Sequence, residues 1–152
     1  MRRLALVFSS GLGLGYLPWA PGTFGTLWGV LLFYLGRFWP WPYFAAATLL
    51  FIFFAVAVSR LAEQSLGEHD SSQIVIDEVA GYLTSVVALP FGWKTALLAF
   101  VLFRIFDIVK PYPIRYIDRH WGGGWGVVMD DVVAGIFANI VLRLLMALGR
   151  MM

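Results

Sequence analysis

Two short motifs each place a pair of carboxylates next to an apolar stretch. V-I-D-E-V-A-G contains Asp77 and Glu78, and V-M-D-D-V-V-A-G contains Asp130 and Asp131. Acids at a helix N-terminus stabilise the helix dipole by about 0.3–1 kcal/mol, which is the simplest explanation of one pair. Two pairs in matching contexts need more, because four clustered carboxylates repel each other unless a cation binds among them. Oxygen ligands without histidine or cysteine suit Mg²⁺, so the sequence predicts that these four acids bind Mg²⁺.

A third motif, F-R-I-F-D-I-V-K-P-Y-P-I, spaces charged residues at every third position. Arg104, Asp107 and Lys110 would share one side of a helix, which Pro111 would end. One interpretation is an internal ladder of ion pairs. The other is that the two cations bind phosphate, while Asp107 orients them, binds metal or handles a proton.

A fourth motif, P-W-A-P-G-T-F-G-T at 18–26, contains a Pro-Gly turn ahead of an apolar segment. Thr23 or Thr26 could be an ordinary helix N-cap. Alternatively, the backbone N–H groups near Gly22 and the threonine hydroxyls could hold a phosphate at the start of a helix. The glycines of 122–126 could form a flexible connector or allow the backbone to approach a ligand closely.

The composition is that of a membrane protein. Hydrophobic residues make up 61% of the 152 residues and charged residues 13%, whereas soluble domains are about half apolar and about a quarter charged. A net charge of +2 does not favour nucleic-acid binding, and the absence of cysteine excludes disulfides, a thiolate nucleophile and zinc–thiolate sites. The N-terminus lacks a clear signal-peptide cleavage site, so we expect it to be retained.

The elements that must position these motifs are apolar segments separated by Pro and Gly turns. We expect one all-α domain over 1–152, a polytopic membrane bundle of about four to five embedded helices with short interfacial pieces. Residues 43–62 are the clearest span, while 4–17 resemble an interfacial or re-entrant piece. The five predicted segments are 24–39, 43–62, 74–92, 95–109 and 127–148.

The distribution of positive charge predicts the orientation. If the five segments alternate in direction, most of the basic residues lie on one side, which the positive-inside rule assigns to the cytoplasm. The basic residues on that side are Arg2, Arg3, Arg60, Lys110, Arg115 and Arg119.

The same topology brings the acids together at the cytoplasmic face. Both acidic pairs would start a segment, and Asp107 would end one, so five acids from three helices meet at one depth. Asp70 and Asp118 would lie on the adjoining loops and are further candidate site residues.

Four ordered motifs give the chain a family resemblance. The segments P-G-T-F-G-T, the stretch from Asp70 to Gly81, 103–114 and 122–135 together resemble the phosphatidylglycerophosphatase A family of bacterial membrane enzymes. The resemblance implies a mostly helical protein of the cytoplasmic (inner) membrane. It also implies an Mg²⁺-dependent phosphatase that converts phosphatidylglycerophosphate to phosphatidylglycerol.

The predicted mechanism is attack by metal-activated water on a lipid phosphate held in the inner leaflet. Asp77, Asp107 and Asp131 are the candidate catalytic acids, and Asp107 or Asp131 would take or orient the proton of water. The phosphate-binding candidates are Arg104, Lys110, Gly22 and Thr23, with Thr26 as a further one. Two alternatives remain, a small ion or proton transporter and a non-catalytic membrane scaffold. The sequence specifies no oligomeric state.

Overall fold

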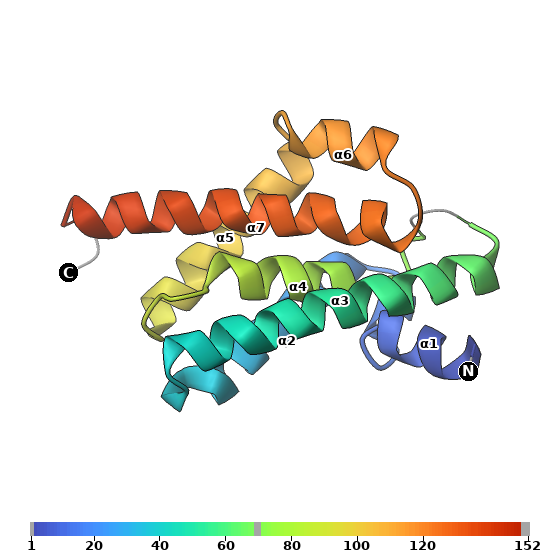
Figure 1. Cartoon of the computed structure of the whole chain (residues 1–152), viewed down its shortest axis with the longest axis horizontal. Coiled ribbons are helices and arrows are strands. Elements are labelled where there is room, and N and C mark those ends of the chain that lie inside the picture. Colours follow the sequence, from blue (N-terminus) through green and yellow to red (C-terminus); the bar gives the residue numbers. More distant parts are fainter. Residues whose placement is uncertain (1, 69–70, 150–152) are drawn as a thin grey trace.

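A computed structural model describes residues 2–68 and 71–149 (Figure 1). Over these ranges the chain forms α-helices and short 3₁₀ helices without β-strands, so the prediction of an all-α fold is confirmed. The α-helices are α1 (Arg2–Ser9), α2 (Pro21–Leu35), α3 (Trp41–Leu66), α4 (Ile76–Ser85), α5 (Trp93–Val109), α6 (Ile114–His120) and α7 (Gly123–Ala147). The 3₁₀ helices are η1 (Leu14–Tyr16) and η2 (Gly36–Phe38).

The helix α3 provides the clearest membrane segment. Among the described helices it alone is both long and apolar enough to cross a bilayer, judged by length and composition. Its 26 residues correspond to about 39 Å of helix, more than the roughly 30 Å of a hydrocarbon core. It ends at Gly67, whose φ of 70° is a conformation that suits glycine.

The bundle is organised around α4. In Figure 1 the long helices α3 and α7 run in opposite directions with α4 between them, and α6 lies beside the first half of α7. The helix α4 packs against α2, α3, α5 and α7. Its start therefore lies at the same end of the bundle as the end of α5 and the start of α7.

The segment predicted over 74–92 is shorter in the structure than the sequence suggested. The helix α4 has only 10 residues, or about 15 Å, and eight of them are buried. It is followed by turns in which Ala88 has a φ of 54°, and α5 begins only at Trp93. The apolar composition of this segment reflects burial inside the bundle, since α4 is too short to span a membrane. The buried Tyr82 hydroxyl donates to the carbonyl of Ala96 at 3.1 Å and ties α4 to α5.

The N-terminal piece, expected to be interfacial or re-entrant, is a short helix followed by a glycine-rich turn. The helix α1 has eight residues and packs against α3. Gly11 and Gly13 then adopt φ values of 58° and 99°, which glycine tolerates without strain. The Trp28 indole donates to the Gly11 carbonyl at 3.0 Å, and the Val75 amide donates to the Ser9 carbonyl at 2.8 Å. These bonds attach the turn to α2 and to the start of α4.

Candidate active site

A polar cavity of about 330 Å³ lies at the end of the bundle where α2, α4 and α7 begin and α5 ends. Its wall carries five carboxyl groups and two cations, so acidic groups exceed the local positive charge. The charged residues around it are Asp77, Glu78, Arg104, Asp107, Lys110, Asp130 and Asp131. The predicted convergence of acids from three helices is therefore present in the structure.

A close crossing of α4 and α7 brings the two acidic motifs together. A Cβ on Gly81 would lie 2.8 Å from the backbone carbonyl of Asp131 and 2.5 Å from the ring of Phe103. A Cβ on Gly135 would collide with the backbone carbonyl of Gly81. Each glycine lies four residues after an aspartate, Asp77 or Asp131, and therefore one helical turn away on the same face. Gly81 and Gly135 therefore let the backbones of α4 and α7 come into contact. This contact lies one helical turn after the aspartates of the two motifs.

Three of the four predicted metal ligands lie close enough to share one ion. Oxygen atoms of Asp77, Glu78 and Asp131 lie within 4.8 Å of one another. Asp77 and Asp131 are 7% and 4% exposed, so bulk water contributes little to stabilising their charge. Asp130, the fourth predicted ligand, is also buried but directs one carboxylate oxygen to Lys110. The donor set of Asp77, Glu78 and Asp131 consists of carboxylates only, which fits a hard divalent cation.

The start of α2 closes the cavity against Glu78. A Cβ on Gly22 would collide with Glu78 Oε1 and lie 3.0 Å from Arg104 Nη1. A Cβ on Gly25 would lie 3.2 Å from Glu78 Oε2 and 2.7 Å from the Val75 carbonyl. The glycines of P-G-T-F-G-T therefore make room for a carboxylate, a role that the sequence analysis did not assign to them.

Burial changes the proton affinity of Glu78. Its pKa is raised to about 8, mainly by desolvation and in smaller part by the nearby carboxylates of Asp131 and Asp107. A hydrogen bond with Asp77 and the charge of Arg104 act in the opposite direction. A bound cation would favour the ionised form of Glu78, so metal binding and proton release are expected to be linked at this site.

The helix-capping explanation applies to only one of the two acidic pairs. Asp77 and Glu78 lie in the first turn of α4, as that explanation requires. The helix α7 begins at Gly123, four residues earlier than predicted, and has no acid in its first turn. Asp130 and Asp131 are therefore two turns inside the helix, where the unsatisfied N–H groups of its N-terminus cannot account for them.

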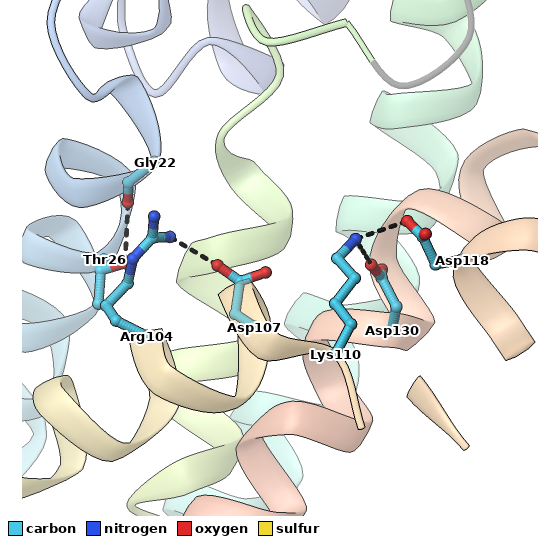
Figure 2. Close-up of polar contacts among 7 residues, drawn as sticks. All are labelled: Gly22, Thr26, Arg104, Asp107, Lys110, Asp118 and Asp130. Atoms are coloured by element: carbon cyan, nitrogen blue, oxygen red, sulfur yellow. Dashed lines mark hydrogen bonds and ion pairs between the residues drawn. The ribbon is translucent and has the colours of Figure 1, made fainter. Parts of the chain in front are cut away.

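The ladder of ion pairs, one of the two interpretations of the α5 motif, forms only in part, as Figure 2 shows. Arg104 Nη1 lies 2.8 Å from Asp107 Oδ2. Lys110 instead lies 2.5 Å from Asp118 and 2.7 Å from Asp130. Lys110 follows the last residue of α5 and has a φ of 45°, so it has left the helical face that carries Asp107. Burial alone would lower the pKa of Lys110, but its hydrogen bonds with Asp118 and Asp130 raise it above the ordinary value.

The remaining predicted residues occupy different positions. Gly22 borders the cavity, whereas Thr23 and Thr26 are not among the residues around it. The buried Thr26 hydroxyl donates to the Gly22 carbonyl at 2.8 Å (Figure 2), so it stabilises the first turn of α2. Asp118 reaches the site through Lys110, and Asp70 lies outside the described residues. Ser71 and Ser72 also border the cavity, and their loop gave no signal in the sequence that would have identified them.

Comparisons with known proteins give one consistent family. A family model described as Phosphatidylglycerophosphatase A matches residues 7–146. The protein named Phosphatidylglycerophosphatase A from Escherichia coli (strain K12) is 38% identical over 133 residues, which cover 87% of this chain and 77% of that protein. The protein of the same name from Haemophilus influenzae is 39% identical over 138 residues, covering 87% of this chain and 82% of that protein. A Bacteroides thetaiotaomicron protein named "Putative phosphatidylinositol-3-phosphatase" is 38% identical over 151 residues, covering 91% of both chains. No solved structure gives a significant match.

Proposed function

Because the chain belongs to the phosphatidylglycerophosphatase A family, we propose that it removes the terminal phosphate of phosphatidylglycerophosphate and yields phosphatidylglycerol. The observation that carries this proposal is the cavity itself. Carboxylates of the buried Asp77 and Asp131 and the half-buried Glu78 lie close together beside Arg104, so one space offers both a cation site and a phosphate-binding group. Metal-assisted removal of a phosphate monoester uses this combination of charges.

The proposed metal is Mg²⁺, and its ligands are Asp77, Glu78 and Asp131. Clustered oxygen donors suit Mg²⁺, which commonly takes one or two carboxylates together with substrate phosphate and water. When bound, the ion supplies positive charge to the phosphate oxygens and makes water more acidic. Asp130 supports this group from the side, because its ion pair with Lys110 fixes its position.

The other charged groups of the cavity bind the substrate and move the proton. Arg104, oriented by Asp107 at 2.8 Å, offers forked N–H donors to the phosphate oxygens. The start of α2 at Pro21 and Gly22 borders the same space and contributes the positive end of a helix dipole. Asp107 lines the cavity outside the three-residue metal group, and we assign to it the acceptance of the proton from the attacking water.

We further propose that the chain is a single multi-pass membrane domain in which α2, α3, α5 and α7 are embedded and α4 is enclosed. The helices α2, α5 and α7 each expose a stripe of large apolar side chains at helical spacing. Contact of such stripes with water is unfavourable, whereas contact with lipid is not. The stripes consist of Leu27, Leu31 and Leu35 on α2, Leu97, Val101, Ile105 and Ile108 on α5, and Ile136, Ile140 and Leu144 on α7.

The cavity would face the cytoplasm. Basic residues are more numerous on the elements at the cavity end of the bundle than at the other end, as the positive-inside rule requires of a cytoplasmic face. The cavity end carries Arg3, Arg60, Lys110, Arg115 and Arg119, and the other end carries Arg37, Lys94 and Arg143. The substrate would then present its phosphate from the inner leaflet of a bacterial cytoplasmic membrane.

The gathering of acids favours hydrolysis over the two alternatives. A proton or ion transporter predicts acids staggered through the depth of the membrane, whereas these acids border one cavity. A non-catalytic membrane scaffold predicts that acidic and basic side chains form ion pairs and that no cavity lies among them. The structure has a cavity of about 330 Å³ in which carboxylates outnumber cations.

The proposal is tested by measuring phosphate release in detergent with a panel of lipid phosphates, including phosphatidylglycerophosphate, phosphatidylinositol 3-phosphate and phosphatidic acid. We expect phosphatidylglycerophosphate to be hydrolysed fastest and EDTA to abolish turnover. Asp131→Asn should lower kcat by about 10²–10⁴-fold, the usual contribution of a positioned catalytic group. Glu68→Gln, at an exposed acid outside the cavity, is the matched control. Turnover that survives EDTA would exclude the metal, and near-parental activity of Asp131→Asn would remove that residue from the mechanism.

A further inference from the structure

A second cavity, of about 400 Å³, adjoins the acidic one. It is bordered by the end of α5, the following loop and α6, and it shares Lys110 with the acidic cavity. Lys110 therefore stands between two spaces of different character. One is rich in carboxylates, and none of the described residues around the other is acidic.

Arginine and tyrosine side chains give the second cavity its chemistry. Arg115, Arg119, Tyr112 and Tyr116 all border it and all are exposed. Arg115 donates one hydrogen bond to the Val109 carbonyl at 3.3 Å, which holds its guanidinium beside the end of α5. A guanidinium has five N–H donors, so this bond leaves several for a ligand.

The buried face of α6 fixes the position of this helix, and with it the arginines on its exposed face. Ile114 and Ile117 are buried, so α6 is anchored in the bundle and presents Arg115 and Arg119 outward. The rings of Tyr116 and His120, which also border this cavity, stack with centroids 4.3 Å apart. We name this cluster of Arg115, Tyr116 and Arg119 around the second cavity the α6 basic site. Cations and phenol hydroxyls suit an anion, and the acid of α6, Asp118, is paired with Lys110.

We propose that the α6 basic site holds the phosphodiester of the lipid substrate while the acidic cavity holds its terminal phosphate. The inference rests on the proposed function. Phosphatidylglycerophosphate carries two phosphates joined through a single glycerol, so an enzyme that binds it needs two neighbouring anion sites. The two cavities meet at Lys110, whose ammonium already bridges Asp118 and Asp130. The α6 basic site would therefore select lipids whose phosphate monoester is borne by a headgroup with a phosphodiester.

The test uses the full chain in neutral detergent with short-chain phosphatidylglycerophosphate. The double variant Arg115→Ala/Arg119→Ala should raise KM about tenfold, the order expected for lost charge-assisted hydrogen bonds, and leave kcat within about twofold. Phosphatidylglycerol retains the phosphodiester but lacks the monoester, so its short-chain form should inhibit the double variant about tenfold less well. Inorganic phosphate should inhibit parent and variant equally. Lys94→Ala removes an exposed positive charge at the other end of α5 and should change none of these values.

Each other outcome has a defined meaning. An unchanged KM with unchanged inhibition by phosphatidylglycerol overturns the inference and leaves the proposed function intact. Equal weakening of both inhibitors shows a general charge effect and also overturns it. If Arg115→Ala unfolds the protein because the bond to Val109 is lost, Arg119→Gln alone should still weaken inhibition by phosphatidylglycerol severalfold. A parent protein without activity on phosphatidylglycerophosphate contradicts the proposed function instead.

Discussion

Lys110, just beyond the end of α5, and Asp130, inside α7, form an ion pair with the lysine Nζ 2.7 Å from the carboxylate oxygen. Asp118 on α6 accepts a second hydrogen bond from the same ammonium at 2.5 Å (Figure 2). One side chain thus connects three helices at the mouth of the acidic cavity. The contact also explains why Asp130 lies apart from the three acids whose oxygens converge.

Replacing Lys110 should damage the site more than replacing Asp118. The Asp130 side chain is 8% exposed and that of Asp118 is 29% exposed, so loss of the cation removes the ion pair of the more buried carboxylate. We expect Lys110→Met to lower the free energy of unfolding by about 1–3 kcal/mol and kcat/KM by more than tenfold. Asp118→Asn should cost less than about 1 kcal/mol. Thermal unfolding in detergent and phosphate release measure both effects, and equal losses in the two variants would contradict this ranking.

Gly22→Ala should reduce activity without unfolding the bundle. The added Cβ would collide with Glu78 Oε1 and approach Arg104 Nη1, so it displaces the proposed metal ligand and the proposed phosphate-binding group together. We expect kcat/KM to fall about 10²-fold, as when catalytic groups are misplaced by about 1 Å, with a small change in Tm. Gly122→Ala adds the same methyl group where no atom lies within 4 Å, and it should retain activity. Full activity of Gly22→Ala would show that Glu78 and Arg104 tolerate the displacement.

Gly81→Ala should destabilise the whole fold, because it separates the two helices that carry the acidic motifs. Its Cβ would lie 2.8 Å from the Asp131 carbonyl, an atom of the backbone that cannot rotate away. Overpacking of this kind costs about 1–3 kcal/mol, so both Tm and activity should fall. Gly92→Ala, whose Cβ would meet only Thr95 Oγ1 at 3.6 Å, is the matched control. A stable and active Gly81→Ala protein would mean that α4 and α7 can cross at a greater separation.

The stability of the metal-free protein should fall as pH rises from about 5 to 8. Burial raises the pKa of Glu78 from 4.5 to about 8, so between these values the folded protein holds a proton that the unfolded chain has released. The contribution of protonated Glu78 is complete below pH 4.5 and is lost as pH rises through 8, at up to about 1.4 kcal/mol per pH unit.

This pH dependence has a direct control in Glu78→Gln, whose side chain does not titrate and which should give a flatter profile in EDTA. Added Mg²⁺ should stabilise the parent more at pH 8 than at pH 5, because binding requires the carboxylate. Thermal unfolding in detergent at a series of pH values measures both effects. A parent whose stability in EDTA rises over this range would contradict the burial of a protonated Glu78.

The sequence by itself determined which side chains are available for chemistry and which segments are helical. Nine acidic residues in a chain with 61% hydrophobic residues, four of them in two matching pairs, indicated a hard cation as the ligand. Pro111 and the glycines at 122–124 marked helix ends that the structure has within a few residues. These properties are local, since side-chain chemistry and turn preferences depend on a residue and its immediate neighbours.

Only the tertiary structure decided which acids share a point in space and what each cation contacts. The grouping of Asp77 and Glu78 with Asp131 depends on how closely α4 and α7 cross, which Gly81 and Gly135 permit through contacts between residues far apart in the chain. The partners of Lys110 depend on its leaving the α5 helix with a φ of 45°, a single dihedral angle that redirected it from Asp107 to another helix. Helical spacing predicts the neighbours of a side chain along its own helix, but contacts between helices follow from packing.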